Sequence, residues 1–318
     1  MRIAVTGIGG HLGTGVALEL DRRPDVEVLG MDIDPPRRLM RHVDFHRVMP
    51  ADRRTITSLI RNFDPHAIVH LGVYEPHARS NPSASDERSL WVTMAMLEAA
   101  AKCPSLETIV VRSGLEVYGR HRGTPMRPDE TCEVRPTSRY GKTLASVEEL
   151  CRDFERRSDI PTALIRFAPI VGPHIPSPIG RYLRLPIVPV GLAPNPPFSL
   201  LHTADVPTFV LAAMDQRASG PFNAVARGAV TGAQAARLGG KLAIPIAGPG
   251  WIIARAITGL LGSPLPEHGL ELLTRGRTGD PSLALEKLGV SADYDTVDVI
   301  KDLYEWAPVS YLEPNRAA

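Results

Sequence analysis

The sequence predicts an α/β fold built on a doubly wound parallel sheet, with a smaller, proline-rich lobe toward the C-terminus. First, short apolar runs rich in β-formers alternate with apolar stripes at helical spacing through the first half of the chain, which is typical of βαβ units. Second, a glycine-rich turn at residues 7–13 separates one such run from one such stripe. Third, prolines crowd residues 173–197, where regular structure is hard to sustain.

The glycine turn predicts a dinucleotide-binding unit of the Rossmann type. A strand is expected at residues 1–6, and the helical stripe begins directly after the turn. Gly7 allows the sharp turn off the strand, Gly10 lets the backbone come close to a pyrophosphate, and Gly13 lets the helix pack tightly on the sheet. The helix N-terminus then offers N–H groups and a partial positive charge to the phosphates.

Asp32 ends the second expected strand, nineteen residues after Gly13. An acidic side chain at this place binds the ribose hydroxyls of an adenosine. Because its negative charge would repel a 2′-phosphate, the sequence favours NAD over NADP as cofactor. Arg37 and Arg38 lie close enough in sequence to leave NADP open.

The other expected elements of the first half continue the alternation. They are strands at 43–48, 66–72, 106–112 and 162–167, and helices at 55–63, 85–102 and 138–157. Residues 1–172 are therefore assigned to a dinucleotide-binding domain.

Residues 173–318 are expected to form a substrate lobe built on loops at the carboxyl ends of the strands. Within them, residues 198–226 read as strand, helix and strand and are expected to return to the first domain. For any single residue of 173–197, a merely irregular connection is the alternative. An apolar helix at 251–262 could lie on a membrane, but it is short and Arg255 is its only charge, so we expect it to pack against the lobe.

Composition limits the classes of partner. The net charge is +1 and acidic and basic residues are mixed, so a nucleic-acid surface is not indicated. No apolar stretch is long enough to span a bilayer, and no membrane partner is expected. Cys103, Cys132 and Cys151 form neither a disulfide framework nor a metal spacing. Together with the absence of a signal peptide pattern before the first strand, they predict a reduced, cytoplasmic protein.

Four histidines could suggest a metal site. His42 with His46, and His66 with His70, have spacings that place each pair on one strand face. Because neither pair has a third ligand nearby in sequence, we expect packed or exposed histidines and no metal.

Several motifs together resemble the extended short-chain dehydrogenase/reductase family, the NAD-dependent sugar-nucleotide epimerases and dehydratases. They are TGIGGHLG, FDPHAIVHLG, SGLEVYG, RYGKTLASVEE, RFAPIVGP, and LLHTADV followed by GPFNAVA. The resemblance covers nearly the whole chain. It implies bound NAD, a nucleotide-sugar or similar hydroxylated small molecule as substrate, and a homodimer joined by a four-helix bundle of residues 83–102 and 138–156. The cofactor contacts that it implies are Gly7, Gly10, His11, Leu12, Gly13, Asp32, Asp52, Leu71, Gly72 and Tyr140.

The catalytic half of the family pattern is incomplete. Tyr140 matches the tyrosine that shuttles the proton of the hydroxyl being oxidised. The lysine expected four residues later, which lowers the tyrosine pKa, is Leu144, and the expected serine or threonine is Gly114. Ser113 adjoins Gly114 and is a candidate replacement, although neighbouring strand residues face opposite sides. Lys142 should point away from Tyr140, because two residues along a helix are about 200° of rotation.

Glu116 is a second candidate catalytic residue, since it stands where an acidic residue takes part in elimination in the family's dehydratases. Arg112 and Arg139 could supply positive charge near Tyr140. Two functions follow: an NAD-dependent oxidoreductase or isomerase with Tyr140 as acid and base, or a catalytically impaired NAD-binding sensor or scaffold. The retained cofactor motif favours the enzyme.

Overall fold

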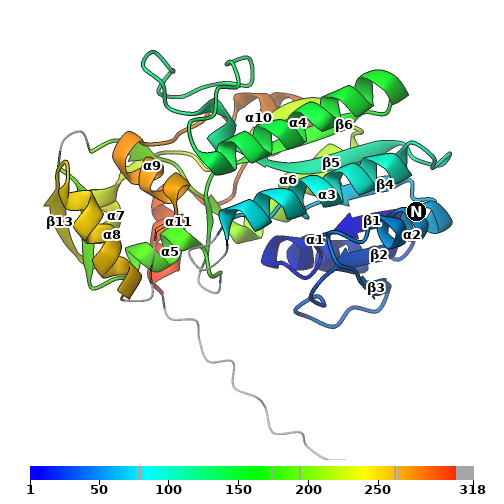
Figure 1. Cartoon of the computed structure of the whole chain (residues 1–318), viewed down its shortest axis with the longest axis horizontal. Coiled ribbons are helices and arrows are strands. Elements are labelled where there is room, and N and C mark those ends of the chain that lie inside the picture. Colours follow the sequence, from blue (N-terminus) through cyan, green and yellow to red (C-terminus); the bar gives the residue numbers. More distant parts are fainter. Residues whose placement is uncertain (77–80, 173–174, 193–194, 261–262, 264, 306–318) are drawn as a thin grey trace, which may run out of the picture.

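The computed structural model describes residues 1–76, 81–172, 175–192, 195–260, 263 and 265–305. Seven parallel strands form the central sheet in the order β11–β6–β5–β4–β1–β2–β3 (Figure 1). These strands are β1 (Arg2–Thr6), β2 (Glu27–Asp32), β3 (Val43–Arg47), β4 (Ala67–His70), β5 (Thr108–Gly114), β6 (Thr162–Phe167) and β11 (Gly220–Ala224). The predicted doubly wound α/β fold is confirmed.

Helices cover both faces of the sheet. On one face α2 (Arg53–Phe63), α3 (Pro82–Ala100) and α4 (Arg139–Ser158) lie side by side, and on the other α1 (His11–Asp21) packs against α6 (Val206–Asp215) (Figure 1). The central strands β1, β4 and β5 are almost entirely buried between these layers. Strands that are covered on both faces have continuous apolar sequences, which is why these strands could be predicted from the sequence.

Local side-chain caps fix the starts of α3 and α4, two of the helices near the site. Asn81 accepts a hydrogen bond from the Ser83 amide at the start of α3, and Pro82 occupies the first turn, where no amide donor is needed. Ser138 accepts from the Gly141 amide at the start of α4, two residues before Tyr140. The position of Tyr140 is therefore set by the cap of its own helix.

Most of the remaining elements form a smaller lobe beyond the carboxyl ends of the strands. Its helices are α5 (Pro178–Leu183), α7 (Gly232–Leu238), α8 (Gly250–Leu260), α9 (Glu267–Arg275) and α11 (Thr296–Tyr304), whereas α10 (Ser282–Leu288) packs on β11 and α6. Its strands are β7 (Ile170–Val171), β8 (Ile187–Gly191), β9 (Pro197–Phe198), β10 (Leu201–His202), β12 (Val230–Thr231) and β13 (Leu242–Ile246). Between them, α6 and β11 lead back to the central sheet, where β11 pairs with β6.

The expectation that the helix near residues 251–262 packs against the lobe is met only in part. The described part of that segment forms α8, which packs on the lobe through the buried Ala254 and Thr258 and the half-buried Trp251. The other large apolar side chains of α8 are exposed, because periodicity does not show how much of a helix the fold covers.

No helix in the described part of the chain is long and apolar enough to cross a membrane. Among the described residues, no group of three or more histidine, cysteine or acidic side chains is arranged to hold a metal ion. All three cysteines are free; Cys103 and Cys151 are buried, and Cys132 is partly exposed.

Candidate functional site

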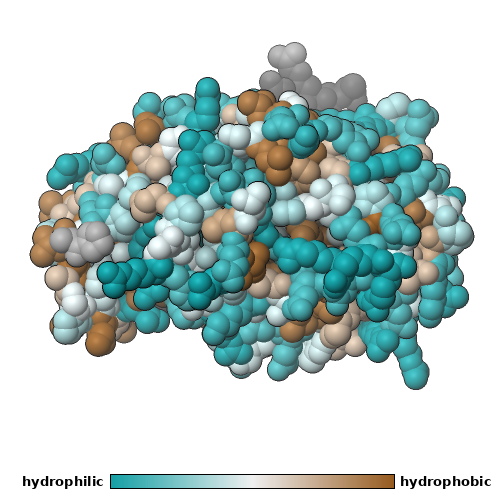
Figure 2. All heavy atoms as spheres, turned by 90° about the horizontal axis from the view of Figure 1, so that it is seen from above, coloured by the Kyte–Doolittle hydropathy of each residue, from teal (hydrophilic) through white to brown (hydrophobic). Residues whose placement is uncertain are grey.

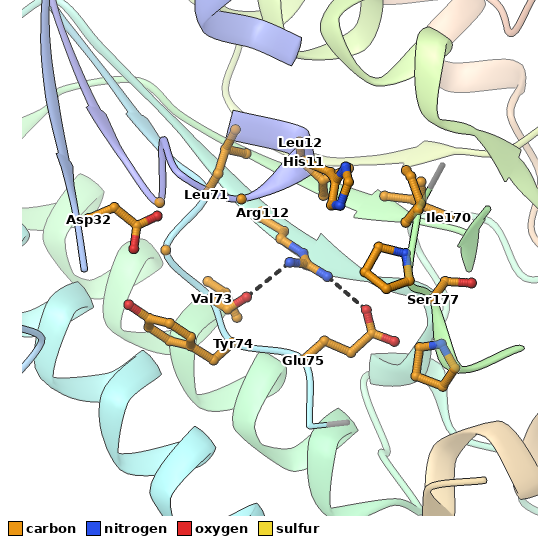
Figure 3. A pocket seen from close by; sticks show the side chains of 16 residues that line it. His11, Leu12, Asp32, Leu71, Val73, Tyr74, Glu75, Arg112, Ile170 and Ser177 are labelled. Carbon is orange, nitrogen blue, oxygen red and sulfur yellow. Dashed lines mark hydrogen bonds and ion pairs between the residues drawn. The ribbon is translucent and has the colours of Figure 1, made fainter. Parts of the chain in front are cut away.

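A cavity of about 290 Å³ opens at the carboxyl edge of the central sheet (Figure 3). Four groups of residues line it: the glycine turn with the first turn of α1, Asp32 at the end of β2, the segment after β4, and Arg112 of β5. Ile170 of β7 and residues 175–178 close it from the lobe. This is the edge at which parallel α/β sheets bind ligands, because the strand order reverses between β1 and β4.

The glycine turn has the close contacts that its sequence predicts. Gly7 adopts a φ of +76°, and a Cβ there would lie 2.6 Å from the Gly72 nitrogen. A Cβ on Gly13 would lie 2.1 Å from the Gly7 carbonyl oxygen. Gly10 precedes α1 without a side-chain cap, and Gly10, His11 and Leu12 line the cavity. The turn therefore leaves room for a ligand phosphate at a helix N-terminus.

Asp32 faces the same cavity from the end of β2 (Figure 3). Its carboxylate accepts hydrogen bonds from the amides of Gly9, at 2.9 Å, and Ile33, at 2.6 Å. Burial raises the pKa of Asp32, and these two amides act in the opposite direction. The carboxylate is thus held rigidly at the cavity wall, where it can accept further hydrogen bonds from ligand hydroxyls.

Among the other residues expected to bind cofactor, Leu71 and Gly72 also line the cavity. Asp52 does not, because its carboxylate caps α2 and accepts hydrogen bonds from the amide and hydroxyl of Thr55. Asp52 thus has a local structural use at an exposed helix end.

Tyr140 and Arg112 meet beside the cavity. Arg112 reaches from β5 along the carboxyl edge of the sheet, and its Nη2 lies 3.4 Å from the Tyr140 hydroxyl. The same guanidinium donates to the Val73 carbonyl at 3.0 Å and to Glu75 Oε2 at 3.1 Å (Figure 3). A permanent positive charge therefore stands next to the tyrosine oxygen, although position 144 holds a leucine.

Glu75 and His268 extend this cluster toward the lobe. His268 of α9 is buried, and its Nε2 lies 3.1 Å from Glu75 Oε1. The His268 ring also packs on the Tyr140 ring with 5.0 Å between ring centres. Burial alone would raise the pKa of Glu75, but His268 and Arg112 outweigh it and lower the pKa to about 2. Glu75 is therefore an anion at neutral pH.

The hydroxyl of Tyr140 is protonated at neutral pH. Tyr140 is almost completely buried. Burial raises its pKa above the usual value, and the charge of Arg112 offsets only part of this effect. The resting group is a phenol that accepts a hydrogen bond from Arg112 and keeps its own proton for donation.

Gly114, Leu144 and Glu116 lie close together. A Cβ built on Gly114 would lie 2.4 Å from Glu116 Oε2 and 3.1 Å from Leu144 Cδ1. Glu116 Oε1 accepts a 2.8 Å hydrogen bond from Arg277, whose other terminal nitrogen donates to Glu271. All three charged side chains are buried. Glu116 thus occupies the space that a serine at 114 would need and is neutralised by Arg277.

Ser113 lies in a different network. Its Oγ donates to Glu148 Oε1 at 2.6 Å, and Glu148 forms a two-bond ion pair with Arg166 of β6. Arg166 in turn donates to the Tyr118 hydroxyl. Glu148, Arg166 and Tyr118 are buried like Ser113. Their network joins α4 to the sheet and does not line the cavity.

Sequence reasoning did not identify Glu75, His268 or Arg277. A signal existed for Glu75, since it follows β4 directly and the carboxyl ends of parallel strands share one edge. His268 and Arg277 carry no comparable signal, because their partners lie 193 and 161 residues away along the chain. Ser89 of α3 accepts a hydrogen bond from the Tyr74 amide and so holds the segment that contains Glu75.

Residues 3–224 match the model of the NAD dependent epimerase/dehydratase family. An uncharacterised protein of Mycobacterium tuberculosis is 28% identical over 99% of this chain and 86% of its own length. An uncharacterised UDP-glucose epimerase of Bacillus subtilis is 28% identical over 55% of this chain and 58% of its own.

Solved structures with the same fold include two sugar-nucleotide epimerases. UDP-glucose 4-epimerase of Thermotoga maritima, solved with UDP-glucose, has a TM-score of 0.73 at 20% identity and covers 96% of this chain and 98% of its own. The Stenotrophomonas maltophila enzyme, solved with NAD and formylated UDP-arabinopyranose, has a TM-score of 0.75 at 20% identity, with coverages of 96% and 97%. These likenesses agree with the resemblance found in the sequence.

Proposed function

Because the chain belongs to the NAD-dependent epimerase/dehydratase family, we propose that it is an NAD-dependent oxidoreductase or isomerase acting on a nucleotide-sugar-like hydroxylated substrate. The observation that carries this proposal is the contact between Arg112, which lines the cavity, and the Tyr140 hydroxyl. It supplies a proton-transfer group and a fixed positive charge next to a site built for a dinucleotide.

The residues around the cavity fit NAD. Gly7, Gly10 and the first turn of α1 would hold the pyrophosphate, because they line the cavity at a helix N-terminus and a side chain at position 7 would collide with backbone. Asp32 would accept hydrogen bonds from the adenosine ribose, and its charge disfavours a 2′-phosphate. When bound, NAD supplies a hydride acceptor and donor.

Tyr140 would hold or move the proton of the substrate hydroxyl. Arg112 stabilises the phenolate form in the role that the family gives to its lysine, and it remains charged at all physiological pH values. Glu75 fixes the guanidinium, and His268 fixes Glu75. These contacts together set the position and the electrostatic surroundings of the Tyr140 hydroxyl oxygen.

The substrate class rests on similarity. The epimerases from T. maritima and S. maltophila were solved with UDP-glucose and formylated UDP-arabinopyranose. Residues 175–178 and Ile170 border this chain's cavity from the lobe, so the lobe is placed to contact a substrate bound next to the dinucleotide. A sugar nucleotide fits this arrangement, since it has a hydroxyl-bearing carbon that can be oxidised and a diphosphate that the protein can bind.

The first experiment is to denature the purified protein and identify released nucleotide by mass spectrometry. Stoichiometric NAD or NADH is expected, followed by conversion of a sugar nucleotide that Tyr140→Phe abolishes. A protein that releases no nucleotide and takes up no added NAD would overturn the proposal. Undiminished conversion by Tyr140→Phe would remove Tyr140 from the chemistry.

A second function, an NAD-binding sensor or scaffold, is favoured by one specific observation. The position that corresponds to the family's lysine is occupied by Leu144, which is apolar, and the space that a side chain at position 114 would need is occupied by Glu116, whose carboxylate is already paired with Arg277. If NAD binds but no sugar nucleotide in a broad panel is converted, this second function replaces the first. Leu144→Lys combined with Gly114→Ser and Glu116→Ala would then be expected to create turnover in the same cavity.

We also propose a homodimer through α3 and α4, as the family resemblance implies. Trp91 and Met94 of α3 are 42% and 46% exposed, although α3 packs against both α2 and α4. Two large apolar side chains one turn apart are suited to a second copy of the bundle. A dimer mass in light scattering that Trp91→Glu reduces to a monomer would support it, and a monomer at micromolar wild-type protein would contradict it.

A further inference from the structure

The exposed side of α8 is more hydrophobic than its buried side. Ile252, Ile253, Ile257 and Leu260 are 74%, 63%, 51% and 89% exposed, and we call these four residues the α8 face. An ordinary surface helix places its apolar stripe inward, because burial of apolar area stabilises the fold. Here the apolar stripe is turned to the outside, which marks a surface that contacts something else.

The strand before α8 adds to this surface. Leu242 of β13 is 60% exposed and pairs in register with Ile187 of β8, which is 48% exposed. β13, α7 and α8 form the end of the molecule far from β3, and brown, hydrophobic side chains are visible at that end in Figure 2. The exposed apolar residues are therefore concentrated on one end of the lobe.

The charges in this part of the chain have one sign. Residues 160–204 and 216–266 contain no aspartate or glutamate, whereas the chain as a whole has 35 acidic and 36 basic residues. The charged side chains from β12 to the end of α8 are Arg237, Lys241 and Arg255. Acidic side chains follow in α9, α10 and α11 and the turns before them.

We propose that the α8 face docks this protein on an anionic lipid surface. Isoleucine and leucine side chains would enter the boundary between headgroups and acyl chains, while Arg255 extends its charged end to lipid phosphates. Trp251, half-buried at the start of α8, is a side chain suited to that depth. The sequence led us to expect no membrane partner, and the outward orientation of α8 is the reason for the change.

A second copy of the chain fits this surface less well. Two such faces would bring Arg255 of one copy close to Arg255 of the other, with no carboxylate on α8 to pair with them. A layer of anionic lipid headgroups supplies negative charge to pair with Arg255 wherever the helix lies on it. The helix has 11 residues and is roughly 16 Å long at 1.5 Å per residue, so it would lie in the interface and not cross it.

The test is sedimentation of the full chain with lipid vesicles. Vesicles of phosphatidylcholine alone are compared with vesicles that contain 30% phosphatidylglycerol, at low and physiological salt. We expect at least tenfold stronger binding to the anionic vesicles, weakened by salt. Ile252→Glu combined with Ile253→Glu should lower this binding at least tenfold, and Arg255→Glu should lower it severalfold.

The matched control replaces exposed apolar residues elsewhere. Leu39→Glu combined with Met126→Glu adds the same negative charge as the α8 double variant, and these side chains are 102% and 53% exposed. This control variant should bind vesicles nearly as well as wild type. Thermal unfolding checks that each variant is folded. Three results would overturn the proposal: no binding to either vesicle, equal loss in the control and the α8 variant, or a wild-type oligomer that the α8 variant alone dissociates.

Discussion

The guanidinium of Arg112 lies 3.4 Å from the hydroxyl of Tyr140, whereas the side chain four residues after Tyr140 is Leu144. The positive charge next to the tyrosine therefore comes from strand β5 and not from the helix that carries the tyrosine. Glu75 and the Val73 carbonyl hold the guanidinium in place. This arrangement gives the Tyr140 hydroxyl a positively charged partner although position 144 is apolar.

The first prediction concerns the pH dependence of turnover. Because burial raises the pKa of Tyr140, its phenolate is a small fraction at neutral pH and increases about tenfold for each pH unit. A step that uses Tyr140 as base should therefore accelerate by nearly tenfold for each pH unit between pH 6 and pH 9, without a plateau. The measurement is kcat for the identified substrate across this range. A plateau below pH 8 would show that another group is the base.

The second prediction moves the positive charge. Arg112→Leu should lower kcat by roughly 10- to 100-fold at pH 8, since an adjacent opposite charge shifts a pKa by about 1–2 units. Adding Leu144→Lys to Arg112→Leu should recover at least tenfold, because a lysine there returns a cation to the same helix face as Tyr140. The kcat of the two variants is compared with that of wild type.

Arg139→Leu is the matched control for this series. Arg139 is next to Tyr140 in sequence but is exposed, where it pairs with Asp86 and Ser83. Its replacement should leave kcat within about twofold. If Arg112→Leu matched this control, Arg112 would have no electrostatic role at Tyr140.

The parts of the site that the sequence predicted are those encoded by local spacing. Gly7, Gly10 and Asp32 follow from one strand, turn and helix, and all three line the cavity. The contacts of Arg112 with Glu75 and of His268 with Tyr140 join elements that only the folded sheet and lobe bring together. The orientation of α8 was missed for a related reason: periodicity gives the apolar side of a helix, but not whether the fold covers it.

The third prediction tests cofactor choice at Asp32. Asp32→Asn keeps the size of the side chain and removes the charge that would meet a ribose or a 2′-phosphate. NAD should bind about 10- to 100-fold more weakly, since hydrogen bonds to a charged group contribute roughly 1.5–3 kcal/mol. The preference for NAD over NADP should fall at the same time. Titration calorimetry measures both, and Asp34→Asn, at an exposed position two residues on, should leave both unchanged.

The fourth prediction concerns His70, which is completely buried between two threonines. Thr93 donates its hydroxyl proton to the Ser89 carbonyl, so it accepts from His70 Nε2 at 2.8 Å. Thr6 then donates to Nδ1 at 2.6 Å. The neutral ring thus has both nitrogens satisfied, and burial lowers the pKa of His70 from 6.5 to about 4.

The sign of the resulting pH effect follows from proton binding. Between pH 6.5 and pH 4 the unfolded chain binds a proton at His70 and the folded chain does not, so stability is lost as the pH falls through this window. The loss from this group is about 3 kcal/mol when complete. Urea unfolding at pH 7 and pH 4.5 should show a smaller decrease in His70→Gln than in wild type. His46→Gln, at a position whose side chain is 38% exposed, should behave as wild type.

The last prediction separates two roles for Glu116. Glu116 and Glu271 flank the buried Arg277, each with a 2.8 Å hydrogen bond, so Glu116→Gln removes half of the charge that neutralises this guanidinium. Unfolding free energy should fall by about 1–3 kcal/mol, and the pH profile of kcat should keep its shape, because the carboxylate is already committed to Arg277. Denaturant unfolding and the pH profile are measured on the same variant. If stability were unchanged while one limb of the profile disappeared, Glu116 would be transferring protons to or from substrate, and the ion pair with Arg277 would be secondary to that role.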